Sequence, residues 1–324
     1  MAEACGDCGI ELSPTLLVCP RCHALVHKRR LAELARDAEA SAASGDHDKA
    51  VTLWRSALVL LPRGSRQFAA VAEKIEAGVR KQQQSKPKPK TISGKVAGTI
   101  TALLVAIATK AKLLLLGLTK LGTLTSILVS FGLYWQIWGW QFAAALLAAI
   151  YIHEIGHVAA LQKRGLAASA PMFVPGFGAF VRMHEHAATP SEDARIGLAG
   201  PLWGLGAAAI AIALYSWTHA VFWLAIVQTV GRLTFFNLTP VWQLDGSRGF
   251  HALSRAQRWM IVAALVIAYA VTREGLLIIV GIAAVWRAFE KQAELEPDWI
   301  AFAQFVVLIG IGAALTTVPV PTSR

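Results

Sequence analysis

The chain has 324 residues, of which 55% are hydrophobic and only 16% are charged, and its formal net charge is +11. A soluble domain usually carries about 25% charged residues, so the composition excludes an ordinary soluble protein and indicates an integral membrane protein with a polar N-terminal part. Residues 81–120 hold eight lysines and no acidic residue. Beside apolar segments, such charge indicates anchoring at the cytoplasmic face. Nucleic-acid binding is the alternative, but interleaved aromatic residues are missing, so we expect no nucleic-acid partner.

All four cysteines lie within the first 22 residues, as two CxxC pairs, Cys5 with Cys8 and Cys19 with Cys22. Two such pairs supply four thiolates, which is the ligand set of a closed structural zinc site. A redox-active dithiol is the alternative, but no βαβ pattern surrounds the pairs. Residues 1–28 resemble the short zinc ribbons of many prokaryotic proteins, which implies one structural zinc ion. With four sulfur ligands the shell is complete, so His23 and His27 are not expected to bind the metal.

Residues 29–80 carry apolar side chains at helical spacing, interrupted by Gly45-Asp46. Residues 31–64 resemble one tetratricopeptide repeat, whose function would be contact with a cytosolic protein partner. The resemblance is carried by the Gly-Asp turn and by Ala50, Trp54, Ala57 and Pro62. A single repeat buries little core, so a helix over 66–80 is expected to cover it. A helical hairpin that serves only as a spacer is the alternative.

Two basic segments lead toward the apolar part of the chain. The stretch KQQQSKPKPKTISGK, residues 81–95, is predicted to be an extended linker because proline and lysine favour a solvated chain. Residues 96–120 are apolar but interrupted by lysines. We predict an amphipathic helix that lies along the membrane surface with its lysines reaching the headgroups. An additional membrane span is the alternative.

Six apolar segments are predicted to cross the bilayer, each near the ~20 residues that a crossing requires. They are residues 121–138, 142–162, 196–217, 220–238, 259–288 (alternatively two short segments hinged near Arg273-Glu274-Gly275) and 299–318. Basic residues after the second, fourth and fifth segments predict a cytoplasmic N-terminus. We therefore expect a mainly α-helical, polytopic protein of the lipid bilayer, in the cytoplasmic membrane of a prokaryote.

The second apolar segment contains an unusual group of ionisable residues. No Asp, Glu, Lys, Arg or His occurs from Leu121 to Ile152, and then His153-Glu154-Ile155-Gly156-His157 follows. His153 and His157 are four residues apart, so on a helix both imidazoles share one face and can bind one zinc ion. Glu154 lies beside them and can deprotonate a zinc-bound water. Core histidines are the alternative, but ionisable groups inside a membrane are costly and indicate function.

Two histidines leave a catalytic zinc ion one protein ligand short. Asp245 follows the fourth apolar segment, precedes Gly246, and by the predicted topology lies on the same cytoplasmic side as the two histidines. Its carboxylate could complete the ligand set. The alternative is an N-cap for a helix that begins near Ser247.

Together these motifs resemble the paired signature of the site-2 protease family of intramembrane zinc metalloproteases. The signature is HExxH in one span and N-x-x-P-x-x-x-L-D-G, here residues 237–246, in a later one. Residues 171–181 look like the membrane re-entrant β-hairpin of that family, and residues 197–201 resemble its small-residue motif. The resemblance covers about 115–250, and the N-terminal 90 residues lie outside it.

The resemblance implies a role for each matching residue. His153, His157 and Asp245 would bind the catalytic zinc, Glu154 would be the general base, and Asn237 would hold the scissile carbonyl or its oxyanion. The substrate would be a membrane protein or a segment like a signal peptide. The protease core would occupy residues 121–250, and C-terminal transmembrane helices residues 251–324.

An unwound substrate could pair with the edge of the expected hairpin by β-augmentation. The candidate substrate-binding residues are Phe173, Val174, Phe177, Gly178, Ala179 and Phe180. A packed loop without contact to substrate is the alternative. A second metal site at His184-Glu185-His186 is less favoured than a solvated loop, because adjacent side chains point in different directions.

Two rival functions follow from the same sequence. One is a catalytically inactive, membrane-anchored adaptor that binds proteins through the ribbon and the repeat. The other is a transporter, which would require an internal repeat of helix pairs that the sequence lacks. The complete set of zinc ligands, general base and Asn237 favours the enzyme.

Overall fold

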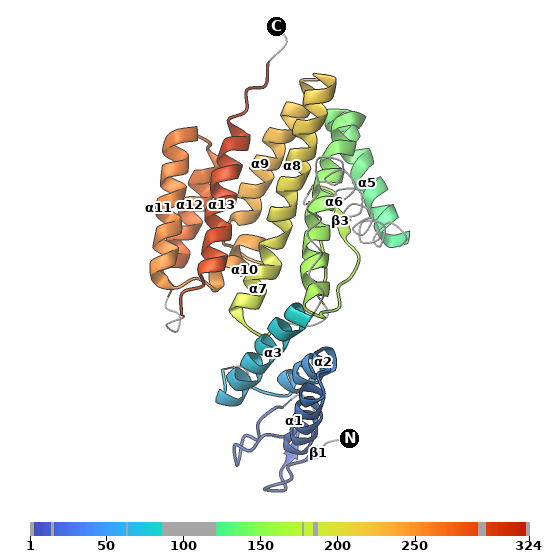
Figure 1. Cartoon of the computed structure of the whole chain (residues 1–324), viewed down its shortest axis with the longest axis vertical. Helices are drawn as coiled ribbons and strands as arrows, with labels where there is room; N and C mark the ends of the chain where they lie inside the picture. The colour runs from blue at the N-terminus through green and yellow to red at the C-terminus, as the bar shows by residue number, and fades with distance from the viewer. Residues whose placement is uncertain are drawn as a thin grey trace. The chain divides into compact units, whose positions relative to one another are not determined.

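The computed structural model describes residues 3–13, 16–62, 64–85, 121–176, 178–183, 187–290 and 296–321. In this part of the chain the protein is mainly helical, as predicted, and it divides into two compact units, Met1–Thr91 and Ile92–Arg324 (Figure 1). The predicted surface helix at 96–120 and most of the predicted linker at 81–95 lie outside the described residues.

The first unit begins with two short antiparallel strands, β1 (Glu3–Ala4) and β2 (Glu11–Leu12). Each CxxC pair lies in a tight turn with the same closing hydrogen bond. The Gly9 N–H donates to the Cys5 carbonyl, and the His23 N–H donates to the Cys19 carbonyl, both at 2.9 Å. Gly9 and His23 also share a left-handed backbone, with φ of 72° and 57°. His23 therefore occupies the position that glycine fills in the first turn.

Three helices follow, α1 (Lys28–Ala43), α2 (His47–Val59) and α3 (Arg66–Ser85). Gly45, with φ of 83°, forms the turn between α1 and α2, and Asp46 caps α2 by accepting a hydrogen bond from the Lys49 N–H. Helix α2 packs against both α1 and α3. Identification of this unit as a tetratricopeptide repeat stays a prediction.

The buried positions explain why the three helices pack together. The core consists of residues at helical spacing on each helix, among them Leu34, Ala38, Ala50, Trp54, Ala57, Ile75 and Val79. Lys74 of α3 pairs with Glu39 of α1 at 2.6 Å and lies over the Trp54 ring. Helix α3 continues past residue 80 because lysine and glutamine are good helix formers, and the first proline comes only at Pro87.

The second unit is a bundle of helices (Figure 1). In the described residues it contains α5 (Leu121–Trp138), α6 (Trp140–Lys163), α7 (Pro190–Gly197), α8 (Ala199–Thr218), α9 (Phe222–Leu238), α10 (Asp245–His251), α11 (Arg255–Thr272), α12 (Leu276–Phe289) and α13 (Trp299–Thr316). Helix α6 packs against α8, α8 against α9, and α9 against α13. At Gly156 of α6, a Cβ would lie 2.6 Å from the Ala199 carbonyl oxygen. Glycine here lets α6 and α8 approach closely, as small residues do between membrane helices.

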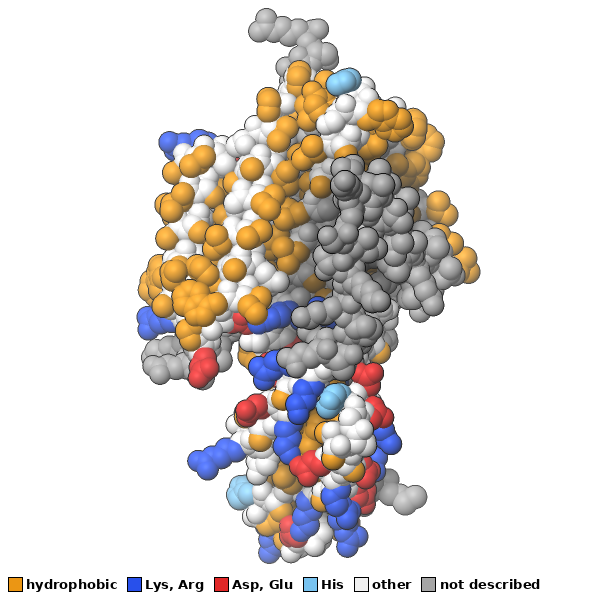
Figure 2. Space-filling view, viewed as in Figure 1, with side chains coloured by type: hydrophobic (Ala, Val, Ile, Leu, Met, Phe, Trp, Pro, Cys, Tyr) orange, Lys and Arg blue, Asp and Glu red, His pale blue; other side chains and the backbone are white. Residues whose placement is uncertain are grey.

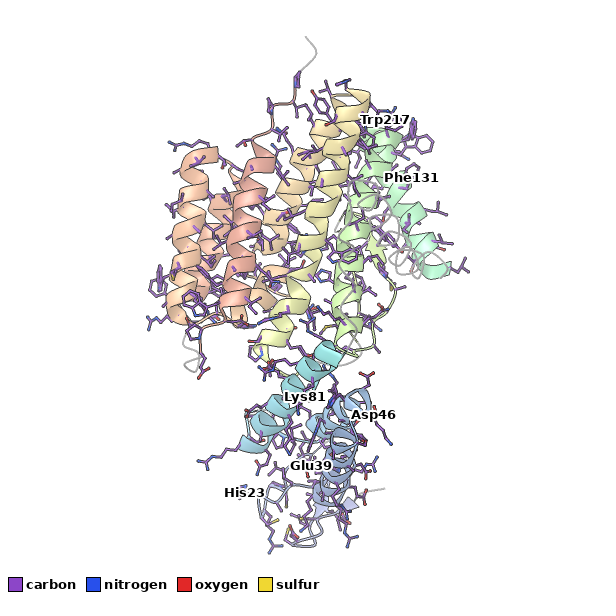
Figure 3. All side chains as sticks on the ribbon, viewed as in Figure 1. His23, Glu39, Asp46, Lys81, Phe131 and Trp217 are labelled. Carbon is purple, nitrogen blue, oxygen red and sulfur yellow. The ribbon has the colours of Figure 1, made fainter. Side chains whose placement is uncertain are left out.

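Three helical segments are long and apolar enough to cross a membrane, Trp140–Lys163, Pro190–Thr218 and Trp299–Thr316, and α12 is a shorter apolar helix. Exposed hydrophobic side chains cover much of the face formed by α8 and α11 to α13 in Figure 2. Trp217, near the end of α8, is 81% exposed (Figure 3). These features fit an integral membrane protein, and the six spans and the cytoplasmic N-terminus stay predictions.

The predicted segment 259–288 forms two helices, α11 and α12, as the hinge alternative anticipated. Helix α11 ends where Arg273 adopts a left-handed backbone with φ of 56°. Glu274 in this turn pairs with Arg232 of α9, with 3.4 Å between Nε and Oε2. The pair provides a counter-charge for Arg232, which lies within the predicted span 220–238.

A short antiparallel strand pair, β3 (Met172–Val174) and β4 (Gly178–Phe180), packs beside α5 and α6. Gly176 and Gly178 have φ of 82° and 100°, a conformation that favours glycine. Phe177 lies outside the described residues. The re-entrant placement of the pair in a membrane stays a prediction.

Helix α5 holds β3 and the turn after it through two side-chain hydroxyls. The Phe173 N–H donates to Ser126 Oγ at 3.1 Å, and the Gly176 N–H donates to the Tyr134 hydroxyl at 3.2 Å. The Phe173 side chain is buried and stacks on Tyr151 of α6. The strand pair is thereby fixed against α6 at Tyr151, two residues before His153.

Candidate metal centre

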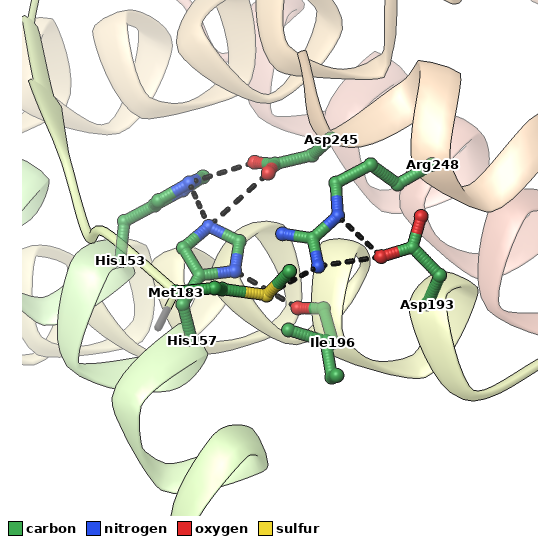
Figure 4. Close-up of polar contacts among 7 residues, drawn as sticks. All are labelled: His153, His157, Met183, Asp193, Ile196, Asp245 and Arg248. Atoms are coloured by element: carbon green, nitrogen blue, oxygen red, sulfur yellow. Dashed lines mark hydrogen bonds and ion pairs between the residues drawn. The ribbon is translucent and has the colours of Figure 1, made fainter. Parts of the chain in front are cut away.

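Three predicted ligands come together between α6 and the start of α10 (Figure 4). Asp245 Oδ2 lies 2.9 Å from His153 Nε2, and Asp245 Oδ1 lies 3.2 Å from His157 Nε2. The two Nε2 atoms are 3.2 Å apart. The helical spacing of the histidines and the turn before α10 thus direct three donor atoms to one point.

This triangle fits a tetrahedral zinc ion. Zinc binds histidine nitrogen at about 2.0–2.1 Å and carboxylate oxygen at about 2.0–2.2 Å, so the donors of a tetrahedral site lie about 3.3–3.5 Å apart. The two nitrogens are 3.2 Å apart, and each lies 2.9 or 3.2 Å from a different oxygen of the Asp245 carboxylate, so these separations come within a few tenths of an ångström of the expected values. Two imidazoles with one carboxylate also form a ligand set of catalytic zinc sites, which keep the fourth position open.

The carbonyl of Ile196 in α7 determines which nitrogen of His157 can bind a metal. His157 Nδ1 lies 2.9 Å from this oxygen. A carbonyl can only accept a hydrogen bond, so Nδ1 carries the proton and Nε2 presents its lone pair to the site. Such a second hydrogen bond orients the ring and is typical of metal-binding histidines.

Gly200 of α8 provides the space for the donor nitrogens. A Cβ at this position would lie 2.1 Å from His157 Nε2 and 2.6 Å from His153 Nε2. Gly200 lies in the stretch 197–201 that resembles the small-residue motif. The structure shows that what packs against Gly200 is the pair of imidazole rings themselves.

Asp245 is the first residue of α10, and no side chain caps this helix. The Asp245 carboxylate instead faces the histidines, and the whole residue is only 8% exposed. Gly246 lets the start of α10 pack directly against the end of α9. A Cβ on Gly246 would lie 2.0 Å from the Leu238 carbonyl oxygen, which is too close for any other residue. Asp245 therefore does not act as the N-cap of a helix that begins near Ser247, which was the alternative.

The remaining two predicted catalytic residues differ in how closely they join this group. Glu154 is buried beside the histidines, within electrostatic range of both and of Asp245. Asn237 lies on the last turn of α9 and is partly exposed. Its role at the site stays a prediction.

The four cysteines form a second group that could hold a metal ion. The Sγ atoms of Cys5 and Cys22 are 3.7 Å apart, and those of Cys8 and Cys19 are 3.6 Å apart. These separations exceed a disulfide bond of about 2.05 Å and match the sulfur separations of about 3.8 Å in a tetrahedral zinc site with bonds of about 2.3 Å. A hydrogen bond from the Cys22 backbone amide lowers the pKa of the Cys19 thiol to about 6, whereas the pKa values of the Cys8 and Cys22 thiols are raised. The thiolate that a metal requires is therefore favoured at Cys19 but not at these two neighbours.

Sequence reasoning missed several residues around the first group. Asp193 and Ile196 of α7, Arg248 of α10, and Ser126 and Tyr134 of α5 were not identified. Asp193 and Arg248 carry a weak signal, since charged residues beside apolar segments often pair. Residues 184–186 lie outside the described part, so the choice between loop and metal site is untested there.

Comparison with known protein families relates part of the chain to one of them. Residues 141–220 match the model of peptidase family M50, the family of the site-2 proteases. The matched segment includes the HExxH motif and the small-residue motif, and it ends before Asp245. Comparisons with curated proteins and with solved structures gave no significant match.

Proposed function

We propose that the chain is an intramembrane zinc metalloendopeptidase that hydrolyses peptide bonds in or near transmembrane segments. One observation carries this proposal: the side chains of His153, His157 and Asp245 converge, with their nitrogen and oxygen atoms close enough together to bind one zinc ion. The match to peptidase family M50 also supports it. That match covers the two histidines but ends before Asp245, so the position of Asp245 is separate support.

The proposed chemistry divides among the residues of the site. A bound zinc ion would lower the pKa of a water molecule and polarise the substrate carbonyl. Glu154 would accept a proton from the attacking water and then give it to the leaving amine. Asn237 would donate a hydrogen bond from its amide to the carbonyl oxygen as negative charge develops there. The Ile196 carbonyl would hold His157 in the tautomer that binds the metal.

A substrate segment in extended form would bind along β4. The Phe173 N–H is directed to Ser126, which occupies the outer edge of β3. Antiparallel strands alternate the direction of their backbone groups, and Ala179 is opposite Phe173, so the Ala179 N–H and C=O point away from β3. Val174 and Phe180 are 37% and 43% exposed and would contact the substrate beside this edge. Strand addition of this kind supplies main-chain hydrogen bonds to an unwound helix.

The N-terminal unit would serve a separate purpose. Four clustered thiols support a structural zinc ion in a ribbon, and the helices that follow support a surface for a cytosolic protein partner. We infer that this unit recruits or selects substrates for the membrane unit. The N-terminus would then be cytoplasmic, in agreement with the positive-inside rule.

Metal content tests the proposal. We expect the full-length protein, purified without chelators, to hold about two zinc ions per chain, one at each group of ligands. Asp245→Ala should lose one zinc ion and retain the other, and Cys5→Ser with Cys8→Ser should do the converse. If Asp245→Ala has the same zinc content as the parent protein, the proposed catalytic site is wrong, and the inactive adaptor becomes the better explanation.

Proteolysis tests the role of Glu154. The probe is a set of single-span reporter proteins co-reconstituted with the full-length enzyme in liposomes. Glu154→Gln should abolish cleavage while the zinc content stays at the parent value, because this side chain moves protons and is not a metal ligand. Cleavage by Glu154→Gln at the parent rate would contradict the mechanism.

A further inference from the structure

An ion pair beside the metal centre has no part in the chemistry described so far. Arg248 of α10 donates from Nε and Nη2 to the same oxygen of Asp193 in α7, at 2.9 and 2.6 Å (Figure 4). The same Nη2 lies 3.0 Å from Met183 Sδ. The two charged side chains are only 20% and 28% exposed, so solvent screens this pair less than a surface pair.

The pair connects two elements that each hold part of the metal centre. Helix α7 supplies Asp193 and, one turn later, the Ile196 carbonyl that orients His157. Helix α10 supplies Arg248 and, one turn earlier, the ligand Asp245. The ion pair therefore joins the element that positions one ligand to the element that carries another.

Helix α10 needs such an anchor because it has only 7 residues. Helices this short are not stable by themselves in water, so tertiary contacts determine their position. Tight backbone contacts at Gly246 hold α10 against the end of α9. The ion pair with Asp193 holds the other side of α10 and limits its rotation about its own axis. Because Asp245 is the first residue of α10, a small rotation would move its carboxylate away from the histidines.

Asp193 also fixes the position of the Arg248 guanidinium. Residues three apart on a helix are neighbours, so the Arg248 side chain starts beside Asp245 on the same helix and could turn toward it. Without Asp193, this cation would be free to attract the Asp245 carboxylate and to compete with a metal ion for it. With Asp193 present, the guanidinium is already paired and points toward α7.

We propose that Asp193 and Arg248 are positioning residues that set the zinc affinity of the metal centre by fixing Asp245 relative to the histidines. This inference rests on the proposed function, because it requires that the three ligands bind zinc. The zinc affinity of the centre would then depend on an ion pair that contacts neither the metal nor the substrate.

The test is a double-mutant cycle on the full-length protein, read out as zinc retained against increasing chelator. The variants are Asp193→Asn, Arg248→Gln and the two combined, with Arg248→Lys as the conservative change. Asp245→Ala identifies the fraction of zinc that belongs to the cysteine group. Arg195→Gln is the matched control, because Arg195 also lies on α7 and pairs with Asp298 at 3.2 Å, but this pair does not reach α10.

We expect Asp193→Asn and Arg248→Gln each to weaken zinc binding at the centre by about 10–100-fold, the usual effect of residues that orient metal ligands. The combined variant should be no weaker than either single variant, Arg248→Lys should recover part of the affinity, and Arg195→Gln should match the parent. A merely structural contact would lower thermal stability in the variants and in Arg195→Gln alike, with no selective loss of zinc.

Three results would overturn the inference. Parent-like zinc affinity in both Asp193→Asn and Arg248→Gln would refute it, as would losses that multiply in the combined variant. Equal losses in Arg195→Gln would refute the specific role of the pair. If Asp245→Ala retains both zinc ions, the proposed function fails first, and this outcome is distinct from those three results.

Discussion

Replacing Gly200 by alanine gives a sharp test of the metal centre. The new Cβ would lie 2.1 Å from His157 Nε2 and 2.6 Å from His153 Nε2, whereas ordinary contact begins at 3.4 Å. The His157 ring would have to retreat by about 1.3 Å, but metal–ligand distances tolerate only about 0.2 Å. The ring cannot move that far and still share a metal ion with its partners. We therefore expect a loss in zinc affinity of at least about 100-fold, which corresponds to about 2.7 kcal/mol.

The assay is zinc retention by full-length protein against a competing chelator, and the chain offers a matched control. Gly204 lies one turn further along α8, and a Cβ there would be in ordinary contact, 3.6 Å from His153 Nδ1. Gly204→Ala should bind zinc like the parent protein. Both substitutions raise helix propensity by about 1 kcal/mol, so a general effect on folding would be common to both. If Gly200→Ala retains zinc as tightly as Gly204→Ala, the close approach of α8 to the two histidines is refuted.

Further predictions concern the ribbon, the strand pair and the N-terminal unit. His23→Val should release the cysteine-bound zinc at lower urea than His23→Gly, with a difference of about 1–2 kcal/mol, because a branched side chain disfavours the left-handed backbone at this position; equal urea midpoints would refute this. Ser126→Ala should remove a hydrogen bond of about 1 kcal/mol to the Phe173 amide, and hydrogen exchange of residues 172–174 should accelerate about fivefold; unchanged exchange would mean that α5 does not hold β3. Deletion of residues 1–90 should change which single-span reporters are cleaved, and identical processing of every reporter would exclude substrate selection by the N-terminal unit.

Much of the helical architecture could be predicted from the chain itself. The predicted segment 121–138 coincides with α5, and the segment 142–162 differs from α6 by two residues at its start and one at its end. Such agreement is expected where a long apolar run has clear ends, because burial of apolar surface dominates the choice of structure. The break between α11 and α12 was expected only as an alternative to one continuous segment, because only the charged turn at Arg273-Glu274 indicated it.

The contacts around the metal centre could not be predicted in the same way. Asp193 and Arg248 are 55 residues apart, and neither lies in a motif with a known spacing. The Ser126 hydroxyl donates to the Thr123 carbonyl of its own helix at 2.8 Å, as serine commonly does in helices, and nothing in the sequence indicates that it also accepts from the Phe173 N–H. Only the packing of α5 against β3 and of α7 against α10 selects these partners.

The sequence by itself determined the local part of the metal centre. His153 and His157 share a face because an α-helix repeats every 3.6 residues, and Asp245 was identified by its motif and by the side on which its segment ends. The tertiary structure decided how three atoms from positions 92 residues apart reach one point. Small residues let the backbones approach, with Gly156 and Gly200 allowing α8 to pack on α6 and Gly246 allowing α10 to pack on α9. Local spacing follows from backbone geometry, whereas the meeting of distant ligands depends on how closely helices pack.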